Sequence, residues 1–423
     1  MKLFQQYPSI IFFFWCTLLF NTNLSQTIPQ RLAELTNTFS SIASRSRHDE
    51  LATPNLIKRN GYPVEVHEVT TQDGYILELH RIPYGLKSPE GPGKLPVFVQ
   101  HGNFQSSSDW MLNDPDNALP LILADNGYDV WLGNQRGNTY STKHIKYTFT
   151  TPAFWNFSYH EAALFDFPAV VDYVLEISNS PKLHYISHSV GSKNFMAGLT
   201  LRPEYNDKIS VGVMMGPAGF MTYMFNGYAR LLGPILRLGQ IMLNIFGPMP
   251  AAPHRVTRFE RFLRPIICKS NVDIIGVCAA FFYSTFGLDR EQITPEKLDE
   301  VKVVFPSTSS YKLWMHLVQE INSGHYRQFD YGTEKNMQVY GKPNPPDYDL
   351  SKITIPISIM HGELDHIARI EDTQALLKLL PNVVDFYVIP WKNWTHLDFN
   401  YAKDAGVLNH AHILDILEQY RFS

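Results

Sequence analysis

The sequence predicts an α/β fold in which helices cover both faces of a mostly parallel central sheet. Strand-like and helix-like segments alternate along most of the 423 residues, which is the pattern of such sheets. Hydrophobic residues make up 44% of the chain and charged residues 18%, and the net charge is −4. This composition excludes a disordered chain, a fibrous protein and a strongly basic nucleic-acid binder.

The expected elements begin with an antiparallel hairpin. Period-two alternation over 64–69 and 74–82 predicts two strands, and the turn residues at 71–74 join them. Continuous apolar runs then predict buried strands, and helical spacing predicts helices. The further strands are expected at 95–100, 128–132, 183–186, 355–360 and 383–389, and the helices at 120–126, 159–178, from about 191 onward, at 372–380 and at about 405–420.

Residues 1–25 predict an export signal. A positive start precedes a short apolar run at 10–20, whereas a membrane span needs roughly 20 apolar residues. A signal anchor is the alternative interpretation. We therefore expect a secreted or lysosomal protein without a stable transmembrane anchor.

Cysteine and asparagine positions agree with export. Cys268 and Cys278 remain after the signal is removed, and one local disulfide between them is expected in an oxidising compartment. Two buried thiols are the alternative. Asn156 and Asn393 lie in glycosylation sequons. The aromatic neighbours of Asn156 predict that this asparagine is buried.

A candidate nucleophile lies between the strand at 183–186 and the helix that follows it. The segment from Ser187 to Gly191 resembles the G-x-S-x-G elbow, which holds a serine, here Ser189, on a tight turn. Ser187 replaces the first glycine. An ordinary strand-to-helix turn with a capping serine is the alternative. The serines at 106–108 have no elbow around them.

The order of residues downstream favours catalysis. In enzymes with this elbow, an acid and then a histidine follow the serine, each after a strand. Asp365 follows the strand at 355–360, and His396 follows the strand at 383–389. The histidine would take the serine proton, and the aspartate would hold the imidazole ring. The rivals are Glu363 and Asp398 for the acid, and His366, His410 and His412 for the base.

An oxyanion hole needs backbone N–H groups aimed at the developing negative charge. Val190 directly follows the nucleophile and is one expected donor. Asn103 is the other, since it follows His101-Gly102 at the end of the strand at 95–100.

Many short blocks of the chain together resemble the acid lipase family of α/β-hydrolases, which contains lysosomal acid lipase and gastric lipase. The similar blocks are 61–67, 73–77, 81–83, 101–102, 106–110, 127–134, 136–138, 154–155, 166–169, 329–332, 336, 340–341, 346–349 and 396–399. The resemblance implies hydrolysis of triacylglycerols or sterol esters by Ser189, Asp365 and His396. It also supports the backbone of Asn103 and Val190 as oxyanion donors. The chain departs from the family pattern at Ser187, at Val190 and at Asn103-Phe104.

The order of the expected elements also suggests how the chain is divided. We expect a signal at 1–25, a leader at 26–60, the first part of a hydrolase core at 61–217, a cap or lid at 218–345 and the second part of the core at 346–423. Apolar residues at helical spacing in the cap, many of them Met or aromatic, suit a lid for variable acyl chains or simply a buried face.

The sequence therefore predicts a serine hydrolase that cleaves neutral-lipid esters through an acyl-enzyme. The alternatives are a catalytically silent lipid-binding protein, a short-chain esterase and an acyltransferase. The expected partners are the lipid ester and the lipid–water interface. No metal or other cofactor and no nucleic acid is expected, and the protein is expected to be a monomer.

Overall fold

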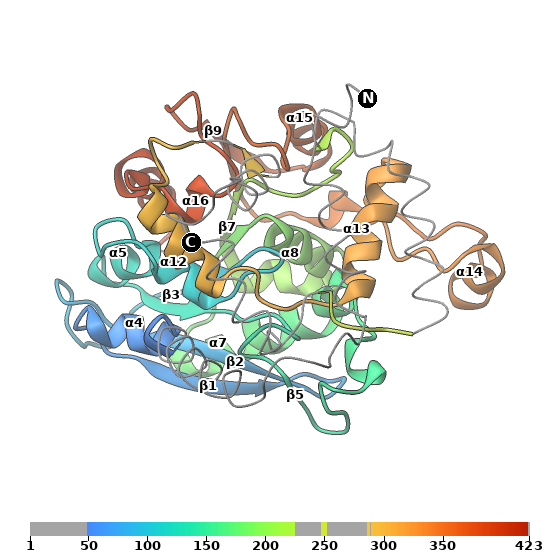
Figure 1. Ribbon diagram of the computed structural model, residues 1–423, viewed down its shortest axis with the longest axis horizontal. Helices are drawn as coiled ribbons and strands as arrows, with labels where there is room; N and C mark the ends of the chain where they lie inside the picture. Colours follow the sequence, from blue (N-terminus) through green and yellow to red (C-terminus); the bar gives the residue numbers. More distant parts are fainter. Residues whose placement is uncertain (1–48, 225–246, 252–285, 288, 422–423) are drawn as a thin grey trace, which may run out of the picture.

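The computed structural model describes residues 49–224, 247–251, 286–287 and 289–421 (Figure 1). Within them nine strands form one sheet in the order β1-β2-β4-β3-β6-β7-β8-β9, with β5 paired to β2. Neighbours from β4 to β9 run parallel, whereas β1, β2 and β5 are antiparallel. The strands are β1 (Glu65–Thr70), β2 (Tyr75–Ile82), β3 (Pro96–Gln100), β4 (Asp129–Leu132), β5 (Lys143–His144), β6 (Leu183–His188), β7 (Ile209–Met215), β8 (Ile357–His361) and β9 (Val383–Val388).

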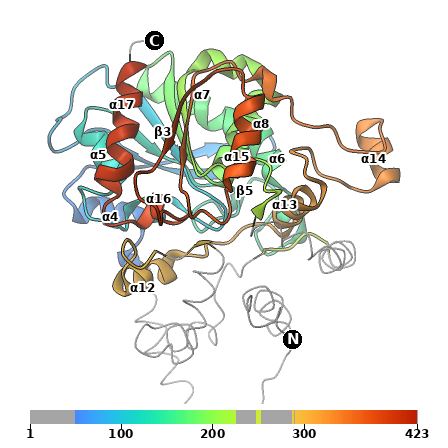
Figure 2. The same ribbon diagram turned by 90° about the horizontal axis from the view of Figure 1, so that it is seen from above.

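Helices cover both faces of this sheet, as Figure 2 shows for α5 and α17 on one face and α7, α8 and α15 on the other. The α-helices of the described residues are α4 (Thr53–Arg59), α5 (Leu119–Asp125), α6 (Tyr159–Glu161), α7 (Phe167–Ser178), α8 (Val190–Leu201), α12 (Pro295–Val304), α13 (Tyr311–Ser323), α14 (Thr333–Tyr340), α15 (Ile370–Leu379), α16 (Asp398–Tyr401) and α17 (Ala411–Gln419). The predicted α/β fold is confirmed.

The core consists of two apolar layers separated by the sheet. All five residues of β3 are buried, and their side chains alternate between the two layers. Val97 and Val99 pack with α5 and α17, whereas Phe98 packs with α7 and α8. A strand that is covered on both faces reads as a continuous apolar run, which is why this strand was predictable.

Besides the two-residue strand β5, the strand β7 was not predicted from the sequence. Its centre is Gly212, and glycine weakens a strand signal. The structure shows why glycine lies there. A Cβ at this position would come within 2.6 Å of the Phe195 ring of α8. Gly212 therefore lets the helix after the elbow pack closely on the sheet.

Two predicted helices have irregular turns. The helix expected at 159–178 is interrupted by a π-helical segment (Ala162–Asp166), and the C-terminal helix begins with another (Gly406–His410). In the expected leader, α4 buries Leu56 and Ile57. Within the expected cap, α12, α13 and α14 are described, and much of the apolar stretch at 221–246 lies outside the described residues. The domain boundaries and the lid stay predictions.

A buried arginine joins the hairpin, the loop after β4 and the π-helical segment. Arg136 has a side chain that is 1% exposed, and it lies 2.6 Å from Asp73 and 2.5 Å from Asp166. Its guanidinium also lies over the Tyr75 ring at 4.0 Å. Planar, bidentate pairing of this kind is specific to arginine.

We expect Arg136→Met to lower the free energy of unfolding by about 3–5 kcal/mol, because it leaves the buried Asp166 carboxylate without its partner. Urea unfolding would measure the change. Arg202→Met is the control, since Arg202 pairs with Glu204 at the surface, and its loss should cost less than about 1 kcal/mol. Equal losses in the two variants would contradict the role assigned to Arg136.

Candidate active site

Ser189 occupies a strained turn between β6 and α8. Its φ is 56° and its ψ is −122°, a conformation that L-residues rarely adopt, and it is 6% exposed. Gly191 permits the turn, because a Cβ there would lie 2.6 Å from the carbonyl oxygen of His101. Ser187 takes the place of the first elbow glycine, and its Oγ lies 3.0 Å from the Oγ of Ser192. A serine is therefore accommodated at that position.

The structure brings the three predicted catalytic side chains into one chain of contacts. His396 Nε2 lies 2.8 Å from Ser189 Oγ, and His396 Nδ1 lies 2.8 Å from Asp365 Oδ2. Asp365 is in the turn after β8, and His396 is in the loop after β9. The aspartate is 1% exposed and the histidine 3%. Strand order alone delivers these groups from distant parts of the sequence to one edge of the sheet.

Asp365 is held as a carboxylate. Its Oδ1 accepts the backbone N–H groups of Ile367 and Ala368, each at 2.8 Å. Burial alone would raise the pKa of Asp365, but the His396 imidazole and these N–H groups outweigh burial and lower it below its usual value. The charged form is the one that holds an imidazole in the right tautomer.

The rival carboxyls have different surroundings. Asp398 is fully buried, and its Oδ2 accepts the Thr395 N–H at 2.6 Å. Its Oδ1 has no hydrogen-bond partner among the described residues. Burial raises the pKa of Asp398 well above its usual value, which favours the neutral acid. Glu363 is exposed to solvent.

The rival histidines have other contacts. His412 stacks on Tyr387 with ring centroids 3.8 Å apart, and its Nε2 lies 3.1 Å from Asp385. Burial lowers the pKa of His410 to about 4. His366 is half-buried in the turn beside Asp365. In the described part of the chain, His396 is the histidine whose ring lies within hydrogen-bond distance of Ser189.

The serines at 106–108 have structural contacts. Ser106 caps the short 3-10 helix Ser107–Met111. Ser107 Oγ lies 2.8 Å from His80 Nδ1, and Ser108 Oγ lies 2.7 Å from the Tyr140 hydroxyl. These contacts account for all three hydroxyls without a catalytic role.

Sequence analysis missed His188, which lies inside the elbow pentapeptide. Its Nε2 lies 3.0 Å from the His396 carbonyl oxygen, and its Nδ1 lies 3.1 Å from Gln105 Oε1. Burial lowers the pKa of His188 well below its usual value, which favours the neutral ring. The same Gln105 oxygen accepts the Gly102 N–H at 2.8 Å. This network joins the nucleophile, histidine and Asn103 loops.

The loop that carries Asn103 lies against the nucleophile. A Cβ on Gly102 would come within 2.9 Å of the Ser189 Cβ. Val190 is the first residue of α8, and the first N–H groups of a helix have no partner within the helix. Phe104, with φ 60°, holds the loop to the segment before α13, because its carbonyl oxygen accepts the Ser307 N–H at 2.6 Å. The oxyanion role of Asn103 and Val190 stays a prediction.

Aromatic side chains from the segment between β7 and β8 lie beside the loops that carry His396 and Asn103. The Phe286 ring is near-parallel to that of His396, with centroids 6.3 Å apart, and the Phe286 carbonyl accepts the His396 N–H at 3.2 Å. Phe305 packs edge-on against Phe286. The Trp314 ring of α13 lies 6.1 Å from that of Phe104. The site is therefore bordered by apolar surface.

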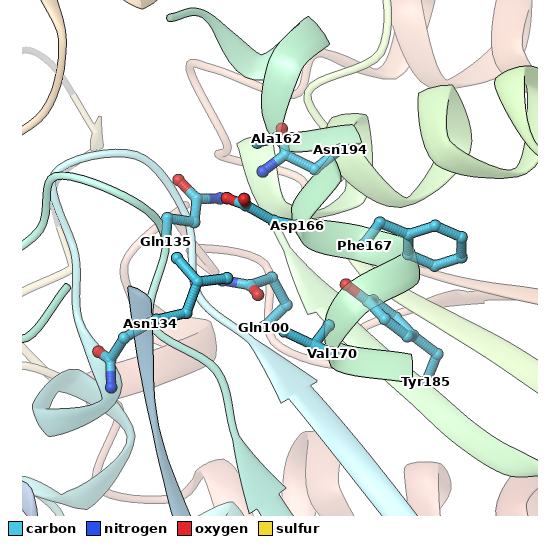
Figure 3. Close-up of a pocket in the computed structure, with 10 residues that line it drawn as sticks. Gln100, Asn134, Gln135, Ala162, Asp166, Phe167, Val170, Tyr185 and Asn194 are labelled. Atoms are coloured by element: carbon cyan, nitrogen blue, oxygen red, sulfur yellow. The ribbon is translucent and has the colours of Figure 1, made fainter. Parts of the chain in front are cut away.

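A small pocket lies beside α8 and is lined by both polar and apolar side chains (Figure 3). Gln135, Asp166 and Asn194 approach one another there, beside Gln100 of β3. Ser189 does not line it.

Both sequon asparagines are exposed. The prediction that Asn156 is buried is wrong: Phe154, Trp155 and Phe157 point into the core, whereas Asn156 faces solvent. Asn393 is also exposed, close to His396 in sequence. Glycosylation of either asparagine stays a prediction. Cys268 and Cys278 lie outside the described residues.

The fold and this site define an α/β-hydrolase. The sequence model for the alpha/beta hydrolase fold matches residues 96–232, and that for the partial alpha/beta-hydrolase lipase region matches 53–114. Lipase 3 of Drosophila melanogaster is 37% identical, covering 86% of this chain and 92% of that protein. Bovine gastric triacylglycerol lipase is 35% identical, covering 83% and 87%. A Crotalus adamanteus protein that carries the name of a lysosomal acid lipase/cholesteryl ester hydrolase is 36% identical, covering 83% and 86%.

The chain therefore belongs to the family of gastric and lysosomal acid lipases, which confirms the resemblance seen in the sequence. Over the described ranges, the structure contains no helix that is both long enough and apolar enough to cross a bilayer.

A substitution at Gly216, the residue after β7, would test the geometry of the site. The φ of Gly216 is +48°, and a Cβ there would lie 2.9 Å from Asp365 Oδ2 and 3.3 Å from His396 Nδ1. We expect Gly216→Ala to push these two groups apart and to slow fluorophosphonate labelling of Ser189 about 100-fold, the scale that a 1 Å misplacement can cause.

Gly219→Ala is the matched control, since a Cβ there meets its nearest neighbour, Leu376, at 3.5 Å. It should label at the wild-type rate. Wild-type labelling of the Gly216→Ala protein would show that the site tolerates the extra methyl group.

Proposed function

We propose that this protein is a serine hydrolase that cleaves the carboxylic ester bonds of neutral lipids, either triacylglycerols or sterol esters. The observation that carries the proposal is the continuous contact from Ser189 through His396 to Asp365 on a strained elbow. Membership of the lipase family supports the reaction class, and the aromatic border of the site suits an acyl chain.

Acylation follows from the positions of the three groups. Ser189 Oγ attacks the ester carbonyl carbon while His396 Nε2 takes the hydroxyl proton. Asp365 accepts a hydrogen bond from the Nδ1–H of His396 and thereby stabilises the imidazolium. The carbonyl oxygen becomes an oxyanion, which the N–H groups of Asn103 and Val190 stabilise. The C–O bond to the alcohol then breaks, and His396 returns its proton to the leaving oxygen.

Deacylation repeats these steps with water. His396 Nε2 removes a proton from the water, whose oxygen attacks the acyl carbon. The tetrahedral intermediate then collapses: the bond between the acyl carbon and Ser189 Oγ breaks, the fatty acid leaves, and His396 Nε2 returns the proton to Ser189 Oγ. No oxidant, reductant or metal is needed for the balance of either half-reaction.

The substrates lie at a lipid–water interface, and we place the enzyme outside the cell or in the lysosome, where residues 1–25 would direct it.

The first test combines labelling with a substrate panel. We expect Ser189→Ala to abolish hydrolysis of a long-chain triacylglycerol and a sterol ester, because the attacking oxygen is removed, while the unfolding transition stays close to wild type. A soluble butyrate ester in the same panel distinguishes a short-chain esterase, and added alcohol as acceptor distinguishes an acyltransferase.

Two outcomes would overturn the proposal. If a fluorophosphonate forms no adduct at Ser189 under conditions that label a gastric lipase, the protein is a lipid binder without this chemistry. If the Ser189→Ala protein still hydrolyses the esters, another residue is the nucleophile.

A second test separates the two buried carboxyls. Asp365→Asn should lower kcat about 10³–10⁴-fold, because an amide no longer holds the imidazole in the productive tautomer. Asp398→Asn should keep most activity, since Asn resembles the neutral acid that burial favours there. Steady-state rates of the two purified proteins, with their melting temperatures, decide the matter. The reverse order of effects would assign the acid to Asp398.

A further inference from the structure

A fully buried ion pair joins α8, the helix that follows Ser189, to α13. Lys193 lies one turn beyond Ser189 on α8, and its Nζ is 2.7 Å from Glu320 Oε2 on α13. Both side chains are 0% exposed. Such a pair is costly to desolvate, and apolar side chains in its place often leave a protein equally stable. Stability alone therefore gives no reason for it.

Aromatic and hydroxyl groups complete the surroundings of the pair. The Tyr326 ring centroid is 4.4 Å from Lys193 Nζ, and the Tyr159 ring centroid is 5.2 Å away. The Tyr159 hydroxyl donates to Glu320 Oε1, and the Tyr326 hydroxyl donates to the Lys193 carbonyl oxygen at 2.5 Å. The two charges are held in one orientation.

The ammonium group has a second acceptor near the active site. Lys193 Nζ donates to the Gly219 carbonyl oxygen at 2.6 Å. Gly219 belongs to residues 216–224, which follow β7 and are called here the post-β7 segment. This segment begins at Gly216, against Asp365 and His396, and its Ala218 N–H donates to the Ser189 carbonyl oxygen at 3.3 Å. It therefore runs directly beside the nucleophile.

The far end of the post-β7 segment is also held. Asp372, on α15 and 3% exposed, accepts the Thr222 N–H at 3.0 Å and the Tyr223 N–H at 2.8 Å. Between the two anchors, Met221 takes a positive φ of 56°. Two polar anchors thus hold a segment whose residues Ala218, Met221 and Met224 are buried in the same apolar cluster as Val190.

We infer that Lys193 is a positioning residue that sets the acyl-chain preference of the enzyme. Paired with Glu320, it holds the Gly219 carbonyl and thereby fixes the post-β7 segment as the apolar wall beside Ser189. The inference rests on the proposed function for its substrate. Its structural part, the anchoring of the segment, can be measured without turnover.

The test replaces the pair by apolar side chains, in the double variant Lys193→Met, Glu320→Leu. The new side chains are similar in volume to those they replace, and the variant loses the bond to Gly219. We expect faster backbone hydrogen exchange in peptides that cover 216–224. We also expect the ratio of kcat/KM for long-chain over butyrate esters to change about tenfold, the scale of one misplaced methylene in an apolar pocket. Fluorophosphonate labelling of Ser189 should change much less.

The matched control is Lys312→Met, Glu161→Gln. Like the first pair, this ion pair connects α13 to another helix, in this case α6, and its Nζ and Oε1 atoms are 2.8 Å apart. Unlike the first pair, it has no bond to the post-β7 segment. Glutamine at 161 can still accept the Ser158 N–H that caps α6. Exchange of 216–224 and the substrate ratio should stay at wild-type values. If the first double variant does not fold, Asp372→Asn loosens the other anchor, and the same changes are expected from it.

Each outcome has one interpretation. Unchanged exchange in the folded variant overturns the inference, and so does an unchanged substrate ratio in a Ser189-dependent enzyme. If the wild-type protein is neither labelled by the fluorophosphonate nor able to hydrolyse any of the esters, the proposed function is overturned instead. Hydrogen exchange then still decides whether Lys193 holds the segment.

Discussion

The close crossing of α8 over the end of β3 is the constraint on which the site depends. At Gly191 the helix approaches the His101 carbonyl to a distance that leaves no room for a Cβ. The chain must therefore turn sharply between β6 and the helix, and Ser189 takes a positive φ that costs of the order of 1–3 kcal/mol. The buried strands on either side supply the packing that maintains this strain. In return, the hydroxyl projects beyond the sheet edge, next to the unpaired N–H groups of a helix start.

The parallel sheet then determines which groups can meet this hydroxyl. Strands β8 and β9 end at the same edge as β6, so the loops after them carry Asp365 and His396 to the serine. Two buried aspartates in this region have opposite electrostatic surroundings. Asp365 has two N–H donors and an imidazole, whereas Asp398 has one N–H donor and an unpartnered oxygen within the described chain. These surroundings lower the pKa of Asp365, whereas burial raises the pKa of Asp398.

The sequence predicted the features that are local or follow chain order. A continuous apolar run predicted β3, and the order of elbow, acid and histidine selected Ser189, Asp365 and His396. Features that depend on distant contacts escaped it. Strand β7 was missed because Gly212, which makes room for Phe195, weakens the strand pattern. The burial of Asn156 was predicted wrongly, because aromatic neighbours pointing inward say nothing about a side chain on the opposite side of the turn. No local pattern pairs Lys193 with Glu320, since the two lie on separate helices.

The departures from the family pattern change side chains in the elbow and in the loop after β3. Ser187 fits because its hydroxyl is 3.0 Å from Ser192 within the turn, and the donors assigned to Asn103 and Val190 are backbone groups that side-chain replacement leaves in place. The buried pair of Lys193 and Glu320 differs in kind. An elbow helix could pack with apolar side chains at lower desolvation cost, so the pair is best explained by what it holds in place. Lys193 holds the carbonyl group of Gly219, which lies three residues beyond Gly216, the glycine beside Asp365 and His396. A side chain of the helix that follows Ser189 therefore positions the wall of the site.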